Sequence, residues 1–107
     1  MLDQSRLEQL KEVYSAGLLE DTLPFWLPRS IDEEHGGYMT ALDRDGTLLD
    51  TDKSMWQHGR FAWLLCTLYN RVDKNPLWLE SAKSGIDFMR RHAFDDDGRM
   101  FFQLTRE

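Results

Sequence analysis

Three segments of this chain repeat apolar residues at the spacing of an amphipathic helix, and this repetition constrains the fold more than any other feature. From about residue 2 to residue 20, apolar side chains recur every three or four positions, at Leu7, Leu10, Tyr14 and Leu18. From about residue 53 to residue 71, apolar residues cover most of the helix circumference, which indicates burial on more than one side. The third segment begins with Asn75 as a cap and Pro76 in the first turn, and continues to about His92.

The apolar surface of these helices is larger than the three of them can cover among themselves. We expect the third helix to be lined by its apolar positions, which are Leu77, Leu79, Ala82, Ile86, Phe88 and Met89. The chain has 107 residues, which is enough for one domain of ordinary size and hardly a second. We therefore expect residues 1–107 to form a single incomplete domain.

Prolines and a turn motif mark the connection between the first and second helices. Pro24 and Pro28 follow the first helix, and because proline removes a helical hydrogen bond, the helix should kink near residues 21–24 or a new short helix should begin there. Two short apolar runs then flank Asp45-Gly46, which is a strong hairpin signal. The predicted strands cover residues 38–42, 47–49 and, near the end of the chain, 100–104. The pattern predicts an all-α scaffold with short β-hairpins decorating one end.

The charge balance argues against nucleic acid and anionic membranes as partners, and the single cysteine excludes an internal disulfide and a zinc site built from cysteines. With 13 Lys and Arg against 19 Asp and Glu, the net charge is −6, which is unfavourable for binding nucleic acid or an anionic membrane. No apolar run approaches the roughly 18 residues of a membrane span, and no secretory signal is visible. Cys66 lies among leucines and is expected to be a small buried core residue. We expect a cytoplasmic protein.

Histidines and acidic turns give no metal site. No two of His35, His58 and His92 stand three or four positions apart, as two ligands on one helix face would. Asp43-x-Asp45-Gly46 and Asp95-x-Asp97-Gly98 match only part of a calcium loop, because the acidic first position and the bidentate glutamate are absent. We predict polar turns at both places and no bound metal.

One face of the second helix carries the most informative side chains. Arg60 lies four residues after Trp56 and three before Trp63, so the three share a helix face. A guanidinium donates hydrogen bonds to oxygen atoms and an indole offers a flat apolar surface, a combination that suits carbohydrate. On spacing alone, a structural cation–π stack or a buried ion pair is favoured over a binding site. His58 lies two positions from Arg60, roughly on the opposite side of the helix.

Five short motifs follow one another in a distinctive order. They are His35-Gly36-Gly37-Tyr38, Leu42-Asp43-Arg44-Asp45-Gly46, Asp50-Thr51-Asp52-Lys53, Trp56-x-x-Gly59-Arg60 and Leu68-Tyr69-Asn70. In this order they resemble the N-terminal part of the N-acylglucosamine 2-epimerase family, and the similarity covers the chain from about residue 18 onward. Family members often carry Gln where this chain has His58.

The resemblance implies a fold, a reaction and a set of site residues. The fold would be the N-terminal part of an (α/α)6 barrel, with the sugar site at one end of its inner ring of helices. The reaction would be epimerisation of N-acylglucosamine and N-acylmannosamine, or a related aldose, at carbon 2 through an enediol-type intermediate, without a cofactor. Arg60 would be catalytic, and Trp56, Arg60 and Tyr38 would bind substrate. The two histidines that serve as acid and base in the family lie in a later region and match none in this chain.

Two other functions remain open at this stage. Without the acid and base, the chain could be a non-catalytic helical module that binds a sugar or a protein, and its uncovered apolar faces predict a homo-oligomer. A sugar hydrolase would need two carboxylates across a glycosidic bond. The candidates for that role are Asp43, Asp45, Asp50 and Asp52, and their turn context makes this the weakest hypothesis.

Overall fold

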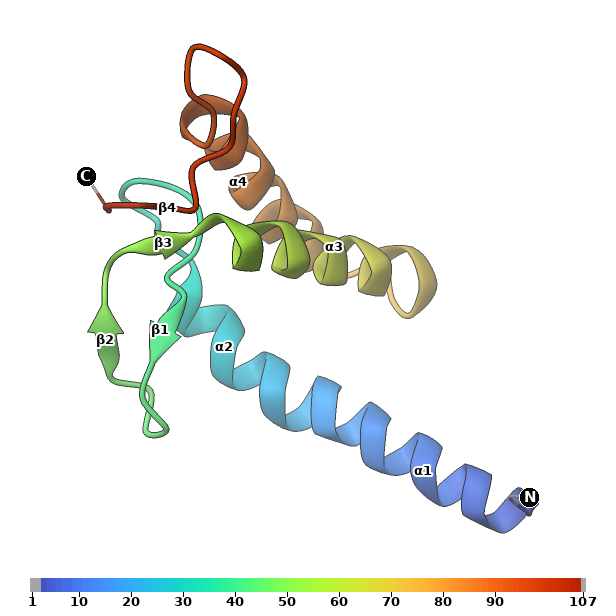
Figure 1. Ribbon diagram of the computed structural model, residues 1–107. Coiled ribbons are helices and arrows are strands. Elements are labelled where there is room, and N and C mark those ends of the chain that lie inside the picture. The colour runs from blue at the N-terminus through green and yellow to red at the C-terminus, as the bar shows by residue number, and fades with distance from the viewer. Residues whose placement is uncertain (1–2, 107) are drawn as a thin grey trace.

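The computed structural model describes residues 3–106, and helices form most of it (Figure 1). The helical elements are α1 (Gln4–Ala16), the π-helix η1 (Gly17–Thr22), α2 (Leu23–Ser30), α3 (Met55–Arg71) and α4 (Pro76–His92). The strands are β1 (Ala41–Leu42), β2 (Leu48–Asp50), β3 (Lys53–Ser54) and β4 (Gln103–Leu104). The prediction of a helical scaffold with small β elements is confirmed for this part of the chain. None of the described helices is long and apolar enough to cross a membrane.

The first three helical elements run on from one another as one long rod (Figure 1). The sequence predicted a kink or a new helix near residues 21–24, and a new α-helix does begin at Leu23. Pro24 lies in the first turn of α2 and lacks the N–H that a continuous α-helix would use at this point. The π-helical turn of η1 precedes it and joins the two α-helices without a break in the rod.

The apolar stripe of α1 is left uncovered. No residue of α1 is buried, and Val13 and Tyr14 are 65% and 73% exposed. The helix extends away from the other elements (Figure 1), and the radius of gyration is 16.0 Å. A compact domain of this length would have a radius of about 13 Å. The apolar stripe that the spacing predicted on α1 is therefore present, and nothing among residues 3–106 covers it.

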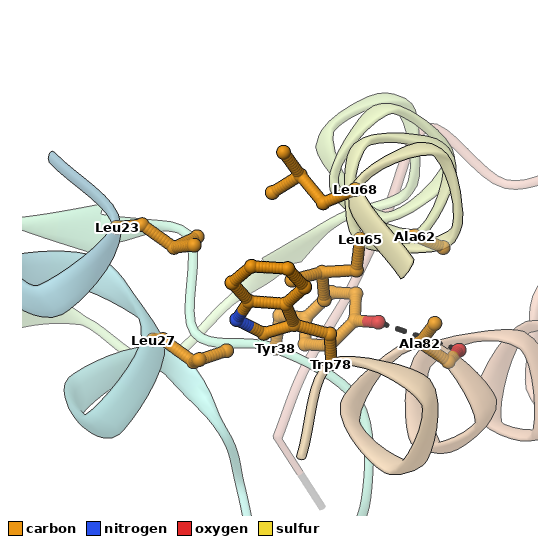
Figure 2. Close-up of a cluster of buried hydrophobic side chains, with 8 residues drawn as sticks. All are labelled: Leu23, Leu27, Tyr38, Ala62, Leu65, Leu68, Trp78 and Ala82. Atoms are coloured by element: carbon orange, nitrogen blue, oxygen red, sulfur yellow. Dashed lines mark hydrogen bonds between the residues drawn. The ribbon is translucent and has the colours of Figure 1, made fainter. Parts of the chain in front are cut away.

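The main core lies where α2, α3 and α4 meet around the ring of Tyr38 (Figure 2). Its buried members are Leu23, Leu27, Tyr38, Ala62, Leu65, Leu68, Trp78 and Ala82. Cys66 packs against this cluster but is only half-buried, so the expectation that it belongs to the buried core is met in part. A smaller cluster of Met55, Phe88 and Ala93 lies at the other end of α3 and α4.

The buried face of α4 agrees only in part with the predicted one, since Ala82 and Phe88 are buried as predicted. Leu77, Leu79 and Ile86 are exposed, whereas the buried positions are Trp78, Ser81, Ala82, Gly85 and Phe88. The prediction counted apolar side chains only. The middle of the observed face consists of small residues, and there the Tyr38 ring packs directly on Gly85, a contact of which the pattern of large apolar residues carries no sign.

Two short antiparallel sheets gather near the start of α3 (Figure 1). β1 pairs with β2 as predicted, and the connecting turn contains Gly46 at φ +93°, a conformation that favours glycine. β3 pairs with β4, with Lys53 opposite Leu104. The predicted helix start at residue 53 is therefore wrong by two residues, and the predicted strand 100–104 is shortened to Gln103–Leu104. This pairing ties the end of the described chain to the residues that lead into α3.

Candidate functional site

Trp56, Arg60 and Trp63 lie together on the outward face of α3, as their spacing predicted. The two indoles are 61% and 68% exposed, and Arg60 is exposed as well. The Arg60 guanidinium carbon lies 4.6 Å from the centre of the Trp56 ring, so the predicted cation–π stack is present. The alternative of a buried ion pair does not hold, because Arg60 has no carboxylate partner among residues 3–106. An exposed, unpaired guanidinium held on an indole can donate hydrogen bonds to a ligand.

A cavity of about 540 Å³ adjoins this face, between the long helical rod and α3. Its walls are mostly apolar, and Arg60 and Gln57 are among its polar members. The lining comprises Leu18, Thr22, Leu23, Trp26, Ser30, Tyr38, Met39, Thr40, Gln57, Arg60, Phe61, Trp63 and Leu64. Arg60 thus borders the cavity while its guanidinium stacks on Trp56, which lies outside the lining.

Tyr38 is buried in the core, with its ring at the border of the cavity. The residue is 1% exposed, and its hydroxyl group donates a hydrogen bond of 2.6 Å to the carbonyl oxygen of Ser81. Burial raises the pKa of this phenol above its ordinary value. The ring borders the cavity, but the hydroxyl group is already used within the core. The Tyr38 hydroxyl group thus serves the core, and a role of this residue in substrate binding stays a prediction.

His58 faces the interior, on the side of α3 opposite to Arg60, in agreement with the sequence prediction. The residue has no exposed surface. Its Nε2 atom accepts a hydrogen bond of 2.9 Å from the backbone N–H of Tyr38, so the proton of the neutral ring lies on Nδ1, which is 2.8 Å from the carbonyl oxygen of Ser54. Burial lowers the pKa of His58 and keeps the ring neutral. His58 thus braces the first turn of α3 against the segment that contains Tyr38.

A buried ion pair that the sequence did not predict lies next to His58. Lys53 and Asp32 are both buried, and Lys53 Nζ lies 2.7 Å from Asp32 Oδ2. The two residues are 21 positions apart, and each lies among polar neighbours in the sequence. The one available signal was that Lys53 belongs to a motif that carries the family resemblance.

The acidic turns behave as the sequence predicted. Asp95 Oδ1 accepts hydrogen bonds of 2.9 Å from the backbone N–H groups of Asp97 and Arg99, and Asp45 Oδ1 accepts one from Thr47. Within residues 3–106, no group of three or more His, Cys, Asp or Glu side chains is arranged to hold a metal ion. The carboxylates that a hydrolase could use are likewise engaged. Asp43, Asp45 and Asp50 accept hydrogen bonds from backbone N–H groups one or two positions on, and Asp52 accepts one from Gln103. The hydrolase hypothesis therefore gains no support from them.

Comparison with known proteins identifies the family. A model of the N-acylglucosamine 2-epimerase family matches residues 36–107. The chain belongs to this family. It is 38% identical over 93 residues to the N-acylglucosamine 2-epimerase of Homo sapiens, an alignment that covers 83% of the chain and 22% of the human protein. It is 40% identical over 77 residues to the N-acylglucosamine 2-epimerase of Bos taurus, covering 70% of the chain and 18% of the bovine protein.

Solved structures of epimerases share the arrangement of the elements. The structure of cellobiose 2-epimerase from Spirochaeta thermophila superimposes with a TM-score of 0.82 at 25% identity, covering 96% of this chain and 25% of that one. The chain thus spans 18 to 25% of the length of these relatives. The relatives are enzymes that epimerise sugars, and the N-acylglucosamine 2-epimerase family match includes the Trp56–Arg60 face.

Proposed function

We propose that the complete gene product containing these residues is a sugar 2-epimerase that interconverts N-acylglucosamine and N-acylmannosamine, with Arg60 as a catalytic residue. The observation that carries the proposal is the exposed Arg60 guanidinium, stacked on Trp56 and without a carboxylate partner among residues 3–106. The family match and the identity of 38–40% to N-acylglucosamine 2-epimerases support this substrate class. We further propose that residues 1–107 are the N-terminal portion of an (α/α)6 barrel.

The chemistry of epimerisation explains why an unpaired arginine matters. Removal of the proton at carbon 2 of an open-chain sugar moves negative charge onto the neighbouring carbonyl oxygen. A guanidinium already in place at that oxygen stabilises the charge as it develops, which is the usual way in which a fixed donor lowers such a barrier. Stacking on Trp56 restrains the guanidinium while leaving its edge free to donate. The exposed face of Trp56 is available to the apolar side of the sugar.

The acid and the base of the proposed reaction do not come from the histidines of this segment. His58 is buried on the other side of α3. His92 stacks against Phe88, with ring centres 5.0 Å apart, and His35 lies 3.5 Å from Glu34. In the proposal these groups hold the fold, and the proton-transferring residues lie outside residues 3–106. The segment contributes the substrate-binding Arg60 and Trp56.

Solvent exchange tests the proposed reaction directly. The complete gene product is incubated with N-acetylmannosamine in D₂O, and the products are followed by proton NMR. Removal of the proton at carbon 2 gives an enol-type intermediate, and reprotonation from D₂O delivers deuterium, so we expect N-acetylglucosamine that is deuterated at this position. Cellobiose and mannose, assayed in parallel, show whether another sugar is preferred. The absence of exchange with every one of these sugars would contradict an epimerase.

One observation supports a second function, a non-catalytic helical module that binds a sugar or a protein. Large apolar side chains on α1, including Val13 and Tyr14, are exposed, and such faces favour association. Light scattering of the purified protein distinguishes the two proposals when combined with the exchange assay. An oligomer that binds N-acetylglucosamine but exchanges no proton would support the module. We also propose that the protein forms a homo-oligomer, which light scattering tests. A cytoplasmic location is a further proposal, and cell fractionation tests it.

A further inference from the structure

A buried ion pair lies directly beneath the start of α3. The side chains of Lys53 and Asp32 are 0% and 1% exposed, and their charged atoms are 2.7 Å apart. Lys53 Nζ also donates a hydrogen bond of 2.7 Å to the carbonyl oxygen of Gly36 and lies 4.6 Å from the centre of the Phe88 ring. One lysine therefore contacts the segment that follows α2 and the inner face of α4 at the same time.

The Asp32 carboxylate is surrounded by donors. Its Oδ1 atom accepts hydrogen bonds of 3.1 Å from the backbone N–H groups of Glu34 and His35. Its Oδ2 atom accepts a hydrogen bond of 3.2 Å from Arg106 Nε, beyond β4. Burial opposes ionisation, but the hydrogen bonds from Lys53, His35 and Arg106 prevail and hold the pKa of this carboxyl well below its usual range. The Asp32 carboxylate is thus held in its ionised form and fully hydrogen-bonded, which is the condition under which a buried charge is tolerated.

Replacement of a buried ion pair by apolar residues often leaves stability unchanged, so stability alone does not explain such a pair. Directional bonds fix geometry in a way that apolar contacts do not. Lys53 is the first residue of β3, two positions before α3 begins. In the next turn, His58 links the carbonyl oxygen of Ser54 to the backbone of Tyr38. The ion pair and His58 together fix the orientation of the first turns of α3.

We propose that Lys53 and Asp32 are positioning residues that set the orientation of α3 and thereby place Trp56 and Arg60 against the sugar. Neither residue contacts substrate, and both act through the placement of Trp56 and Arg60, with most of the effect on the rate coming through Arg60. This inference rests on the proposed function, since it assigns the pair to the same epimerase site. A displacement of about 1 Å at a catalytic group can cost about 100-fold in rate, so a small rotation of α3 is enough to matter.

The chain offers a matched control for the pair. Lys83 and Asp87 form an equally short contact of 2.6 Å on α4, but the Lys83 side chain is 74% exposed. Exposed pairs contribute little to stability and fix little geometry. Lys83→Met therefore removes the same charge and the same type of contact without disturbing the support of α3, and it should leave the activity unchanged.

The experiment is a double-mutant cycle on kcat/KM for N-acetylmannosamine epimerisation by the complete gene product. Lys53→Met alone should lower kcat/KM at least about tenfold, mainly through kcat, because the lost interaction is the one that Arg60 makes in the transition state. In the Arg60→Ala background, Lys53→Met should change kcat/KM less than about twofold, because the residue through which it acts is absent. The thermal unfolding midpoint should shift by the same amount in both backgrounds.

The outcomes separate this inference from the proposed function. If Lys53→Met lowers kcat/KM by the same factor with and without Arg60, the inference is wrong. An equal loss in Lys83→Met also overturns it. If Arg60→Ala retains full activity, the proposed catalytic role of Arg60 fails, and if the unsubstituted protein epimerises none of the sugars, the proposed function itself fails. Asp32→Asn, which is nearly the same size and keeps the backbone hydrogen bonds, repeats the cycle from the other partner and covers the case in which Lys53→Met does not fold.

Discussion

Replacing glycine by alanine should change the stability of the protein in opposite directions at two helical positions, Gly85 and Gly59. Gly85 in α4 lies against Tyr38, and an added Cβ would overlap the ring and its hydroxyl group. Gly59 in α3 is exposed, and the nearest heavy atom to an added Cβ is Met89 Cε at 4.0 Å. Alanine is favoured over glycine inside a helix by about 1 kcal/mol. That gain applies to both positions, so the difference in the free energy of unfolding between the two variants measures the cost of the contact between the added methyl group and Tyr38.

The magnitude follows from the contacts that each variant changes. At Gly85, forcing an extra methyl into a packed site costs about 1–3 kcal/mol. Displacement of Tyr38 also weakens its hydrogen bond to Ser81, which contributes about 1 kcal/mol. After subtraction of the helix gain of about 1 kcal/mol, Gly85→Ala should lower the free energy of unfolding by about 1–3 kcal/mol. Gly59→Ala should raise it by about 0.5–1 kcal/mol.

Urea unfolding followed by circular dichroism measures both values. The wild-type protein, Gly85→Ala and Gly59→Ala are compared at one pH and temperature, with equal slopes against urea required for the comparison. If Gly85→Ala is as stable as Gly59→Ala, Tyr38 does not pack on α4 as described. The account of the core and of the support beneath α3 would then be refuted.

Two further predictions concern the same support. Gly37 has φ +75°, and an added Cβ would lie 2.7 Å from His58 Nε2 and 2.8 Å from Phe88 Cγ. Gly98 has a similar φ of +80°, but an added Cβ there would have no neighbour within 4 Å. In urea unfolding, Gly37→Ala should therefore destabilise the protein by about 1–3 kcal/mol more than Gly98→Ala. Burial lowers the pKa of His58 in the folded protein, so near neutral pH the unfolded chain binds more protons at this residue than the folded one. The stability contributed by neutral His58 is therefore present above pH about 6.5 and is lost as the pH falls below that value. The urea midpoint should fall between pH 7.5 and 5.5, and less steeply in His58→Gln; identical slopes would contradict this role of His58.

Local signals in the sequence predicted the elements whose cause is local. Asn75 and Pro76 marked the start of α4, where Asn75 Oδ1 accepts a hydrogen bond from the backbone N–H of Leu77. The Asp45-Gly46 turn marked the β1–β2 hairpin. The buried face of α4 was not predictable in this way, because it depends on Tyr38, whose hydroxyl group reaches a carbonyl 43 residues away. The pairing of β3 with β4 likewise joins residues far apart in the sequence.

In the candidate site, too, the sequence predicted the features that depend on local spacing and did not predict those that depend on distant residues. Helical spacing was enough to place Trp56, Arg60 and Trp63 on one face, because that relation lies within a single helix. The state of each side chain depends on distant residues. Nothing in the sequence indicated that Tyr38 packs against Gly85 and belongs to the core. The Asp32–Lys53 pair gave no periodic signal, because its two members come from different segments.

The central claim is that Arg60 is catalytic because its guanidinium is free to bind the sugar. Arg29 is a matched control, since it is also exposed and its guanidinium carbon lies 4.7 Å from the centre of the Phe25 ring. The most direct measurement is kcat/KM for N-acetylmannosamine epimerisation by Arg60→Ala and Arg29→Ala forms of the complete gene product. We predict a loss of about 100-fold or more for Arg60→Ala and a change of less than about twofold for Arg29→Ala. Equal kcat/KM values in the two variants would contradict the account.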